Sequence, residues 1–293
     1  MSFWNILRVL VTNSCNYQCL YCHNEGQKEK NSCHEISYEC FVDVMERIKN
    51  IGLKEIRFSG GEPLINKDVI KMIEWVNDNT SMEVGLATNA SLINEEIAKR
   101  LGQTRAMVTI HLPGFDDASY RKVTKNGSFD LFKSKVDLLE KYNIDYSFNF
   151  VLYPEIVDSI KEIVEFVVAR RKRVKLLPFI ENGFHNYSKN SINKVTDILN
   201  NMRTNYKYNT DQDASYWYFE NGACVKMIDS PCYFASIESC RKYGEIRLLP
   251  NLSLQTCIFG KNVKINDITK IGELMQDLWD NFNICLIKGN AEQ

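Results

Sequence analysis

Apolar and polar positions over the first 180 residues repeat with two different periods. Six short runs rich in apolar and β-branched residues predict buried strands at residues 6–12, 55–60, 83–88, 106–112, 146–152 and 173–179. Between them, apolar residues recur every three to four positions, which predicts amphipathic helices at residues 35–52, 67–79, 94–102, 129–143 and 159–171. Strands that alternate with helices favour a parallel sheet with right-handed crossovers. We therefore expect an α/β fold and favour a partial (β/α)6 barrel of the TIM type; a flat parallel sheet is the alternative, since periodicity alone does not separate the two.

The pattern changes after about residue 205. Residues 205–226 are polar and aromatic, and we interpret them as irregular chain. Farther on, residues 245–257 predict a hairpin, with a strand on each side of a turn at Pro250–Asn251. We therefore divide the chain into a barrel, residues 1–205, and a smaller C-terminal module, residues 206–293.

The composition limits the classes of partner. Hydrophobic residues make up 44% and charged residues 25% of the 293 residues, and the net charge of −1 gives no bulk attraction to nucleic acid or to an anionic membrane. We find no signal peptide and no apolar run of membrane-spanning length, so we expect a cytoplasmic protein. In a reducing compartment the ten cysteines are expected to be metal ligands, catalytic thiols or buried apolar side chains.

Three of these cysteines, Cys15, Cys19 and Cys22, cluster directly after the first predicted strand. Three thiolates are too few for a closed structural zinc site or for an ordinary iron–sulfur carrier, so the set indicates a metal site with one position left open for a ligand. A zinc site completed by His23 or His34 is the alternative. Two further cysteines, at positions 33 and 40, are expected to be structural.

The stretch "CNYQCLYC" resembles the Cys-x-x-x-Cys-x-x-Cys signature of the radical S-adenosylmethionine (SAM) superfamily, including the aromatic Tyr21 before the last cysteine. The second predicted strand ends in "SGGEPL", residues 59–64, which is similar to the Gly-Gly-Glu-Pro motif of that superfamily. The resemblance covers roughly residues 6–180. It implies a four-iron, four-sulfur (4Fe-4S) cluster on the three cysteines, cleavage of SAM to a 5′-deoxyadenosyl radical, and a flavodoxin or ferredoxin as electron donor.

The same resemblance implies where SAM binds. Two glycines would let the backbone approach the ligand closely, a glutamate would accept a hydrogen bond from its ammonium group, and a proline would fix the turn. Further polar residues follow the next strands. The residues that the resemblance places near SAM are Tyr21, Gly60, Gly61, Glu62, Pro63, Asn89, His111 and Asn149. For the last three, a structural role as a cap or a strand-end polar group is the alternative.

A second group of cysteines lies near the C-terminus. The segment from Cys240 to Cys257 resembles the first hairpin of the SPASM and twitch extensions of radical SAM enzymes, which implies an auxiliary 4Fe-4S cluster. Cys224 and Cys232 are the expected additional ligands, with Cys285 in reserve. Alternatively some of these cysteines are buried apolar residues, and Cys224 could instead be a free catalytic thiol that donates a hydrogen atom to a substrate radical.

This segment also resembles the C-terminal motif of the GTP cyclase that begins molybdenum-cofactor biosynthesis, with Arg8 and Arg247 at matching positions. Three features depart from the two patterns. Leu252 replaces a usual turn glycine of the SPASM hairpin, Tyr243 stands in the place of the cyclase's middle cysteine, and Glu245 replaces an arginine of that enzyme.

These resemblances imply a radical SAM enzyme that removes a hydrogen atom from a small polar nucleotide, sugar or aminosugar. Whether the outcome is cyclisation or rearrangement, dehydrogenation or epimerisation stays open. A maturase that modifies a ribosomal peptide is the alternative, and a non-catalytic iron–sulfur redox or sensor protein is the alternative from a different class.

Overall fold

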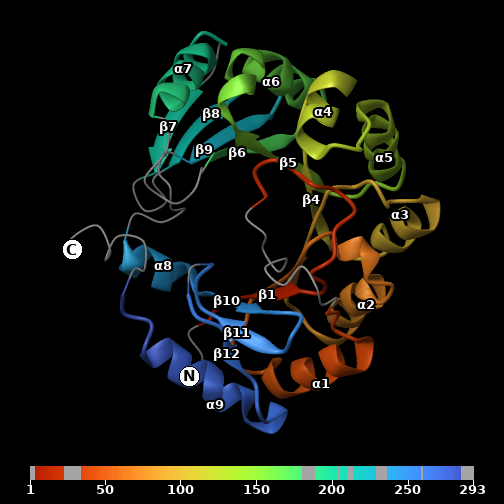
Figure 1. Cartoon of the computed structure of the whole chain (residues 1–293), viewed down its shortest axis with the longest axis vertical. Helices are drawn as coiled ribbons and strands as arrows, with labels where there is room; N and C mark the ends of the chain where they lie inside the picture. Colours follow the sequence, from red (N-terminus) through yellow and green to blue (C-terminus); the bar gives the residue numbers. More distant parts are fainter. Residues whose placement is uncertain are drawn as a thin grey trace.

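The computed structural model describes residues 4–22, 34–179, 189–202, 205–209, 214–228, 236–258 and 260–284. Its strands form one sheet that curves into a ring, and helices cover the outside of the ring (Figure 1). The inner side of this ring is the lumen side of the barrel. In this part of the chain, no helix combines the length and apolar character needed to cross a membrane. The α/β fold and the partial barrel expected from the sequence are confirmed.

The parallel core of the sheet consists of the six predicted strands, each paired with the next in order along the chain. Their ends differ from the predicted ends by no more than two residues. They are β1 (Ile6–Leu10), β2 (Glu55–Ser59), β3 (Glu83–Thr88), β4 (Met107–His111), β5 (Tyr146–Leu152) and β6 (Arg173–Pro178).

Each strand turns one face to the helices and the other to the lumen. On β2, Ile56 and Phe58 are buried against the helical layer, while Glu55 and Arg57 alternate with them on the opposite face. A two-residue period of this kind is required by the pleat of a strand. The lumen of this barrel is therefore lined by polar and charged side chains as well as apolar ones.

The helices that cover the ring follow the strands in order. They are α1 (Tyr38–Ile48), α2 (Val69–Asn79), α3 (Glu95–Leu101), α4 (Asp117–Thr124), α5 (Phe129–Lys141), α6 (Ile160–Ala169) and α7 (Lys189–Asn200). In α1, the Ser37 hydroxyl accepts a hydrogen bond from the Cys40 N–H at 3.2 Å and caps the first turn. The apolar side of this helix, which includes Phe41 and Ile48, is buried. Cys40 lies in this helix, as predicted.

The prediction of irregular chain at residues 205–226 was wrong. Most of that segment folds into β7 (Asn205–Asn209), β8 (Ala214–Tyr218) and β9 (Cys224–Ile228), an antiparallel extension whose last strand pairs in parallel with β6. β7 alternates polar and aromatic residues and β8 mixes small, polar and aromatic residues, so neither shows a continuous aliphatic run. Helices α4 and α7 were not predicted either, because few of their residues are apolar.

The predicted hairpin at residues 245–257 is confirmed. It forms β10 (Glu245–Leu248) and β11 (Ser253–Gln255), which are antiparallel, and β12 (Val263–Lys264) follows. Leu252 in the turn has φ of 56°, which explains why a glycine is usual there. β10 pairs in parallel with β1, and two further helices, α8 (Ile237–Tyr243) and α9 (Ile271–Asp280), complete this region. The division of the chain at residue 205 stays a prediction.

Candidate active site

The loop that carries the three clustered cysteines begins at the carboxyl end of β1. Loops at the carboxyl ends of parallel barrel strands are where active sites of this architecture form. Backbone N–H groups of Gln18 and Leu20 donate to the carbonyls of Thr124 and Val123 at the end of α4, at 3.3 and 3.1 Å. The cysteine loop is therefore held against the outer helical layer over the end of the sheet.

The three thiols differ in exposure, since Cys15 and Cys19 are partly buried and Cys22 is exposed. Burial, and then the negative charge that Cys22 and Cys15 would carry, raise the pKa of Cys19 to about 12. Burial raises the pKa of Cys15 as well. Among the residues that the structure describes, no three Cys, His, Asp or Glu side chains are arranged to hold a single metal ion. His23 and Cys33 lie outside the described residues.

The motif "GGEP" follows β2 and is joined to the start of the cysteine loop by backbone hydrogen bonds. Gly61 N–H donates to the Thr12 carbonyl at 2.9 Å, and Glu62 N–H donates to the Ser14 carbonyl at 2.8 Å. Gly60 has φ of +144°, and a Cβ atom on it would lie 2.4 Å from the Thr12 oxygen. A Cβ on Gly61 would lie 2.1 Å from the Ser14 oxygen. Both glycines are therefore required for the close contact between the two loops.

The carboxylate of Glu62 is buried and binds the end of β3. Its oxygens accept hydrogen bonds from the Thr88 hydroxyl at 2.6 Å, the Asn89 N–H at 2.8 Å and the Leu64 N–H at 3.1 Å. Burial raises its pKa to about 7, although these three hydrogen bonds oppose the rise. Pro63 opens the short 3-10 turn that follows. The carboxylate thus fixes the loops after β2 and β3 relative to each other.

Asn89 connects the loop after β3 to the cysteine loop. Its side-chain N–H donates to the Asn16 side-chain oxygen at 2.9 Å, and Asn16 in turn donates to the Ser91 hydroxyl at 2.8 Å. Asn16 directly follows Cys15. Sequence reasoning missed Asn16, and its position inside the cysteine motif is the signal that could have identified it.

Tyr21 and His111 join the cysteine loop to β4. The Tyr21 hydroxyl and His111 Nε2 are 2.9 Å apart, and the two rings meet edge to face. Burial lowers the pKa of His111 to about 4, although a hydrogen bond with the Asn149 backbone acts to raise it. The imidazole is therefore neutral at pH 7. Asn149 lies beside His111 in the neighbouring strand β5. The structure therefore gathers all the sequence-predicted SAM residues at one end of the barrel.

Three of the C-terminal cysteines, Cys224, Cys240 and Cys257, lie toward the other end of the barrel. Cys224 is the first residue of β9 and is paired with Arg173, the first residue of β6. Cys240 is in α8, which leads directly into the amino end of β10. Cys257 follows β11, which runs back toward that same end. The structure does not bring Cys224 to the loop of Cys15, and Cys232 and Cys285 lie outside the described residues.

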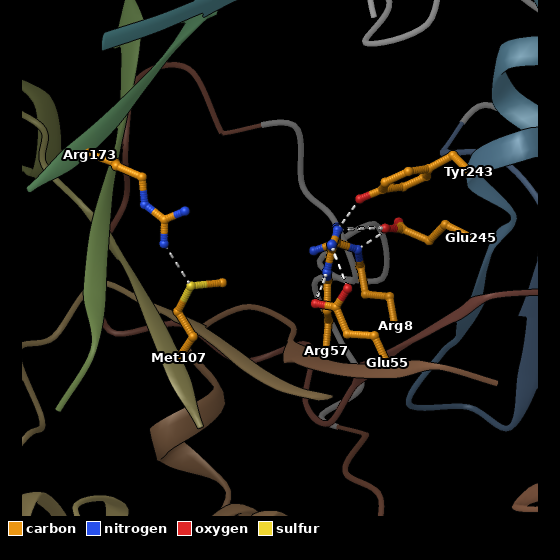
Figure 2. Close-up of polar contacts among 7 residues, drawn as sticks. All are labelled: Arg8, Glu55, Arg57, Met107, Arg173, Tyr243 and Glu245. Atoms are coloured by element: carbon orange, nitrogen blue, oxygen red, sulfur yellow. Dashed lines mark hydrogen bonds and ion pairs between the residues drawn. The ribbon is translucent and has the colours of Figure 1, made fainter. Parts of the chain in front are cut away.

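Charged side chains meet in the lumen between these two ends. Arg8 and Glu245 form a bidentate ion pair, with distances of 2.7 Å between Nε and Oε1 and 2.9 Å between Nη2 and Oε2. Arg57 lies 3.4 Å from the same carboxylate, and it also binds Glu55 and donates to the Tyr243 hydroxyl (Figure 2). Burial alone would raise the pKa of Glu245, but the neighbouring arginines lower it to about 2.

Sequence reasoning identified only part of this lumen. Glu55 and Arg57 on β2 were missed, as was Lys226 on β9. The available signal was a pair of charged residues two positions apart in a strand that is otherwise mostly apolar, as in "EIRFS" and "RVKLL".

Two curated proteins resemble this chain over most of its length. The chain is 28% identical over 263 residues to a GTP 3′,8-cyclase of Campylobacter lari, which covers 86% of this chain and 80% of that protein. It is 30% identical over 227 residues to a probable GTP 3′,8-cyclase of Methanocaldococcus jannaschii, which covers 70% of this chain and 72% of that protein.

Among solved structures, anSMEcpe with bound AdoMet has a similar fold, with a TM-score of 0.70 at 16% identity over 95% of this chain and 81% of that one. Streptococcus suis SuiB bound to S-adenosylmethionine matches with a TM-score of 0.68 at 15% identity, over 99% of this chain and 68% of that one. A sequence model of the Radical SAM superfamily matches residues 9–167, more than half of the chain, and the protein therefore belongs to the radical SAM superfamily.

Proposed function

We propose that this radical SAM enzyme removes a hydrogen atom from a small polar nucleotide held in the barrel lumen. As a member of its superfamily, it uses a 4Fe-4S cluster and SAM, which together supply the one-electron chemistry. Cys15, Cys19 and Cys22 would hold this cluster, because three thiols on one loop at the carboxyl end of the sheet leave one metal position open for a ligand.

The residues around this loop would bind and orient SAM. The backbone of Gly60 and Gly61 lies directly against the cysteine loop, while Glu62 and Asn89 fix the loops around it. His111 is neutral and partly buried, so it would hydrogen-bond without adding charge. Tyr21, Pro63 and Asn149 line the same end of the sheet, and we expect this packed, mostly desolvated surface to exclude water.

The observation that carries the choice of substrate is the charged lumen. A wall that holds Arg8, Arg57 and Glu245 suits a polar, hydrogen-bonding ligand and disfavours an apolar one. The relatives at 28% and 30% identity are named GTP 3′,8-cyclases, which favours a nucleotide over a free sugar or an aminosugar. A flavodoxin or ferredoxin would deliver the electrons.

We also propose an auxiliary 4Fe-4S cluster at the far end of the lumen. Cys240 and Cys257 lie near the amino end of β10, and Cys224 lies at the amino end of β9. Together with Cys232 they would supply four thiolates, which closes a cluster. A closed cluster would transfer electrons or shape the pocket and would not bind substrate directly.

The test is anaerobic reconstitution, reduction with dithionite, and chromatographic measurement of 5′-deoxyadenosine with and without GTP. We expect the wild type to form 5′-deoxyadenosine and GTP to stimulate this formation. The variant in which Cys15, Cys19 and Cys22 are all changed to Ala should form none. Cys40→Ala, which alters a thiol on α1, is the matched control and should leave formation unchanged. Undiminished SAM cleavage in the folded triple variant would contradict the assignment of the three cysteines as cluster ligands. SAM cleavage that does not change when GTP is added would contradict GTP as the substrate.

A further inference from the structure

An exposed leucine lies inside the cysteine loop. Leu20 stands between Cys19 and Cys22, and 53% of its surface is exposed. Its backbone N–H donates to the Val123 carbonyl at 3.1 Å, in the last turn of α4. A single exposed leucine is ordinary on a protein surface, so its meaning depends on its surroundings. Here the surroundings are the cysteine loop and the end of α4.

The exposed side of α4 is cationic at this end. Arg121, Lys122 and Lys125 are all exposed, and the third lies three or four positions after the other two, which places them on one face. Val123 and Thr124 are buried on the opposite side. The three cations therefore lie on the surface next to the segment that contains Leu20.

Ion pairs do not neutralise these three charges. Arg121 attracts Asp117, one turn earlier, but the Asp117 carboxylate accepts hydrogen bonds from the Phe129 N–H at 2.7 Å and the Ser128 hydroxyl at 3.1 Å. In the part of the chain that the structure describes, none of the three cations forms an ion pair. Positive charge does stabilise the C-terminal end of a helix, but that interaction leaves the exposed charges accessible to a partner.

The backbone at Lys125 gives a second observation. Its φ of 73° and ψ of −45° belong to a region that is strained for residues with a Cβ atom and that suits glycine. A glycine would relieve this strain. The backbone conformation of the loop therefore does not explain why a lysine stands here, whereas a role for its charge would.

We propose that this surface, formed by Leu20, Arg121, Lys122 and Lys125, docks a small acidic electron-carrier protein. The inference rests on the proposal that the neighbouring cysteine loop holds a cluster. The carrier would give one electron to the oxidised cluster and would itself be oxidised by one electron. An apolar contact beside exposed cations suits such a partner, because complementary charge speeds the encounter and fixes the orientation of the two proteins. Electrons would then enter directly at the loop and would not have to cross the barrel.

The experiment measures binding of a bacterial flavodoxin to the reconstituted protein with SAM, by anaerobic calorimetry at low ionic strength. The double variant Arg121→Gln/Lys122→Gln should bind flavodoxin at least about tenfold more weakly, since both charges guide the association. About 1 M salt should remove most of this difference, because the screening length is then only about 3 Å. The matched control is Lys99→Gln/Lys161→Gln, which removes two charges from exposed positions on α3 and α6 and should bind like the wild type.

Two further measurements test the role of the surface in electron delivery. Dithionite is too small to need a docking surface. The ratio of flavodoxin-driven to dithionite-driven formation of 5′-deoxyadenosine, at limiting flavodoxin, should therefore fall about tenfold in the double variant. Lys125→Gly should weaken flavodoxin binding and yet unfold at a higher urea concentration than the wild type, which a purely structural role of this lysine would not produce.

The outcomes separate this inference from the proposed function. Wild type that does not bind flavodoxin, a double variant that binds it unchanged, or an equal loss of binding in the control variant would each overturn the docking surface. Salt-dependent binding that only the double variant loses, in a protein that does not cleave SAM with dithionite, would support the docking surface and reject the proposed function.

Discussion

Glu245 offers a sharp test of the lumen network, the group of ion pairs and hydrogen bonds that joins Arg8, Glu55, Arg57, Tyr243 and Glu245. Changing Glu245 to Gln keeps the shape of the side chain but removes the charge that pairs with Arg8 and Arg57. A fall in pKa from 4.5 to about 2 corresponds to about 3 kcal/mol of stability at pH 7, since a tenfold change in an ionisation constant is worth about 1.4 kcal/mol. Breaking a buried ion pair typically costs about 3–5 kcal/mol. In Glu245→Gln, Arg57 would still pair with Glu55, so we expect a cost at the lower end of this range.

The sign of the pH dependence follows from the direction of the shift. The pKa of Glu245 is lower in the folded state than its ordinary value of 4.5. Its contribution to the unfolding free energy is therefore present above pH 4.5 and is lost as the pH falls toward 2. The gap in unfolding free energy between wild type and Glu245→Gln should therefore be constant above about pH 5 and narrow below it.

The assay is urea unfolding of the cluster-free protein under reducing conditions, followed by circular dichroism. Glu95→Gln is the control, because Glu95 pairs with Lys141 on the exposed surface, where such pairs contribute little. We expect a loss of about 3 kcal/mol for Glu245→Gln and no measurable loss for Glu95→Gln. A loss below about 1 kcal/mol, or a gap that does not narrow in acid, would refute this account of the lumen.

Three further predictions concern the two ends of the barrel. Gly61→Ala should lower SAM cleavage about a hundredfold, because its Cβ would meet the Ser14 oxygen and displace the cysteine loop. Gly272→Ala is the control and should cleave SAM like the wild type, because a Cβ there meets nothing within 4 Å. Equal SAM cleavage by the two variants would show that the loop contact is unimportant. Tyr21→Phe should reduce the unfolding free energy by about 1–3 kcal/mol, since it leaves the partly buried His111 Nε2 without this hydrogen bond. An unchanged urea midpoint would contradict that role. Replacing both Cys240 and Cys257 by Ala should remove about four irons from the reconstituted protein, and retention of full iron would exclude them as cluster ligands.

The barrel and its SAM end could be predicted from the sequence because their signals are local. A buried parallel strand is a short apolar run, and the cysteine triplet and the "GGEP" motif each directly follow one. The antiparallel strands β7 and β8 carry no such run. Tyr216 and Trp217 occupy adjacent positions on opposite faces, so the segment shows neither a continuous apolar stretch nor a clear alternation.

The lumen network could not be predicted because it joins residues far apart in the chain. Arg8 and Glu245 are separated by 237 positions and meet only because β10 returns to pair with β1. Lys175 and Lys226 meet only because β9 pairs in parallel with β6, across an intervening hairpin. A sequence shows the charges in each strand, but the order of strands in the sheet decides which of them become neighbours.

Among the residues that the structure describes, the strands do not close into a complete ring, so the sheet has two outer strands, and the edges of outer strands attract other chains. Here the outermost strands are β12, which spans only two residues and ends in Lys264, and β7, whose centre is Lys207. Short length and lysine are both features that discourage strand addition and aggregation. Both outer strands are therefore poor templates for β-pairing with further copies of the protein.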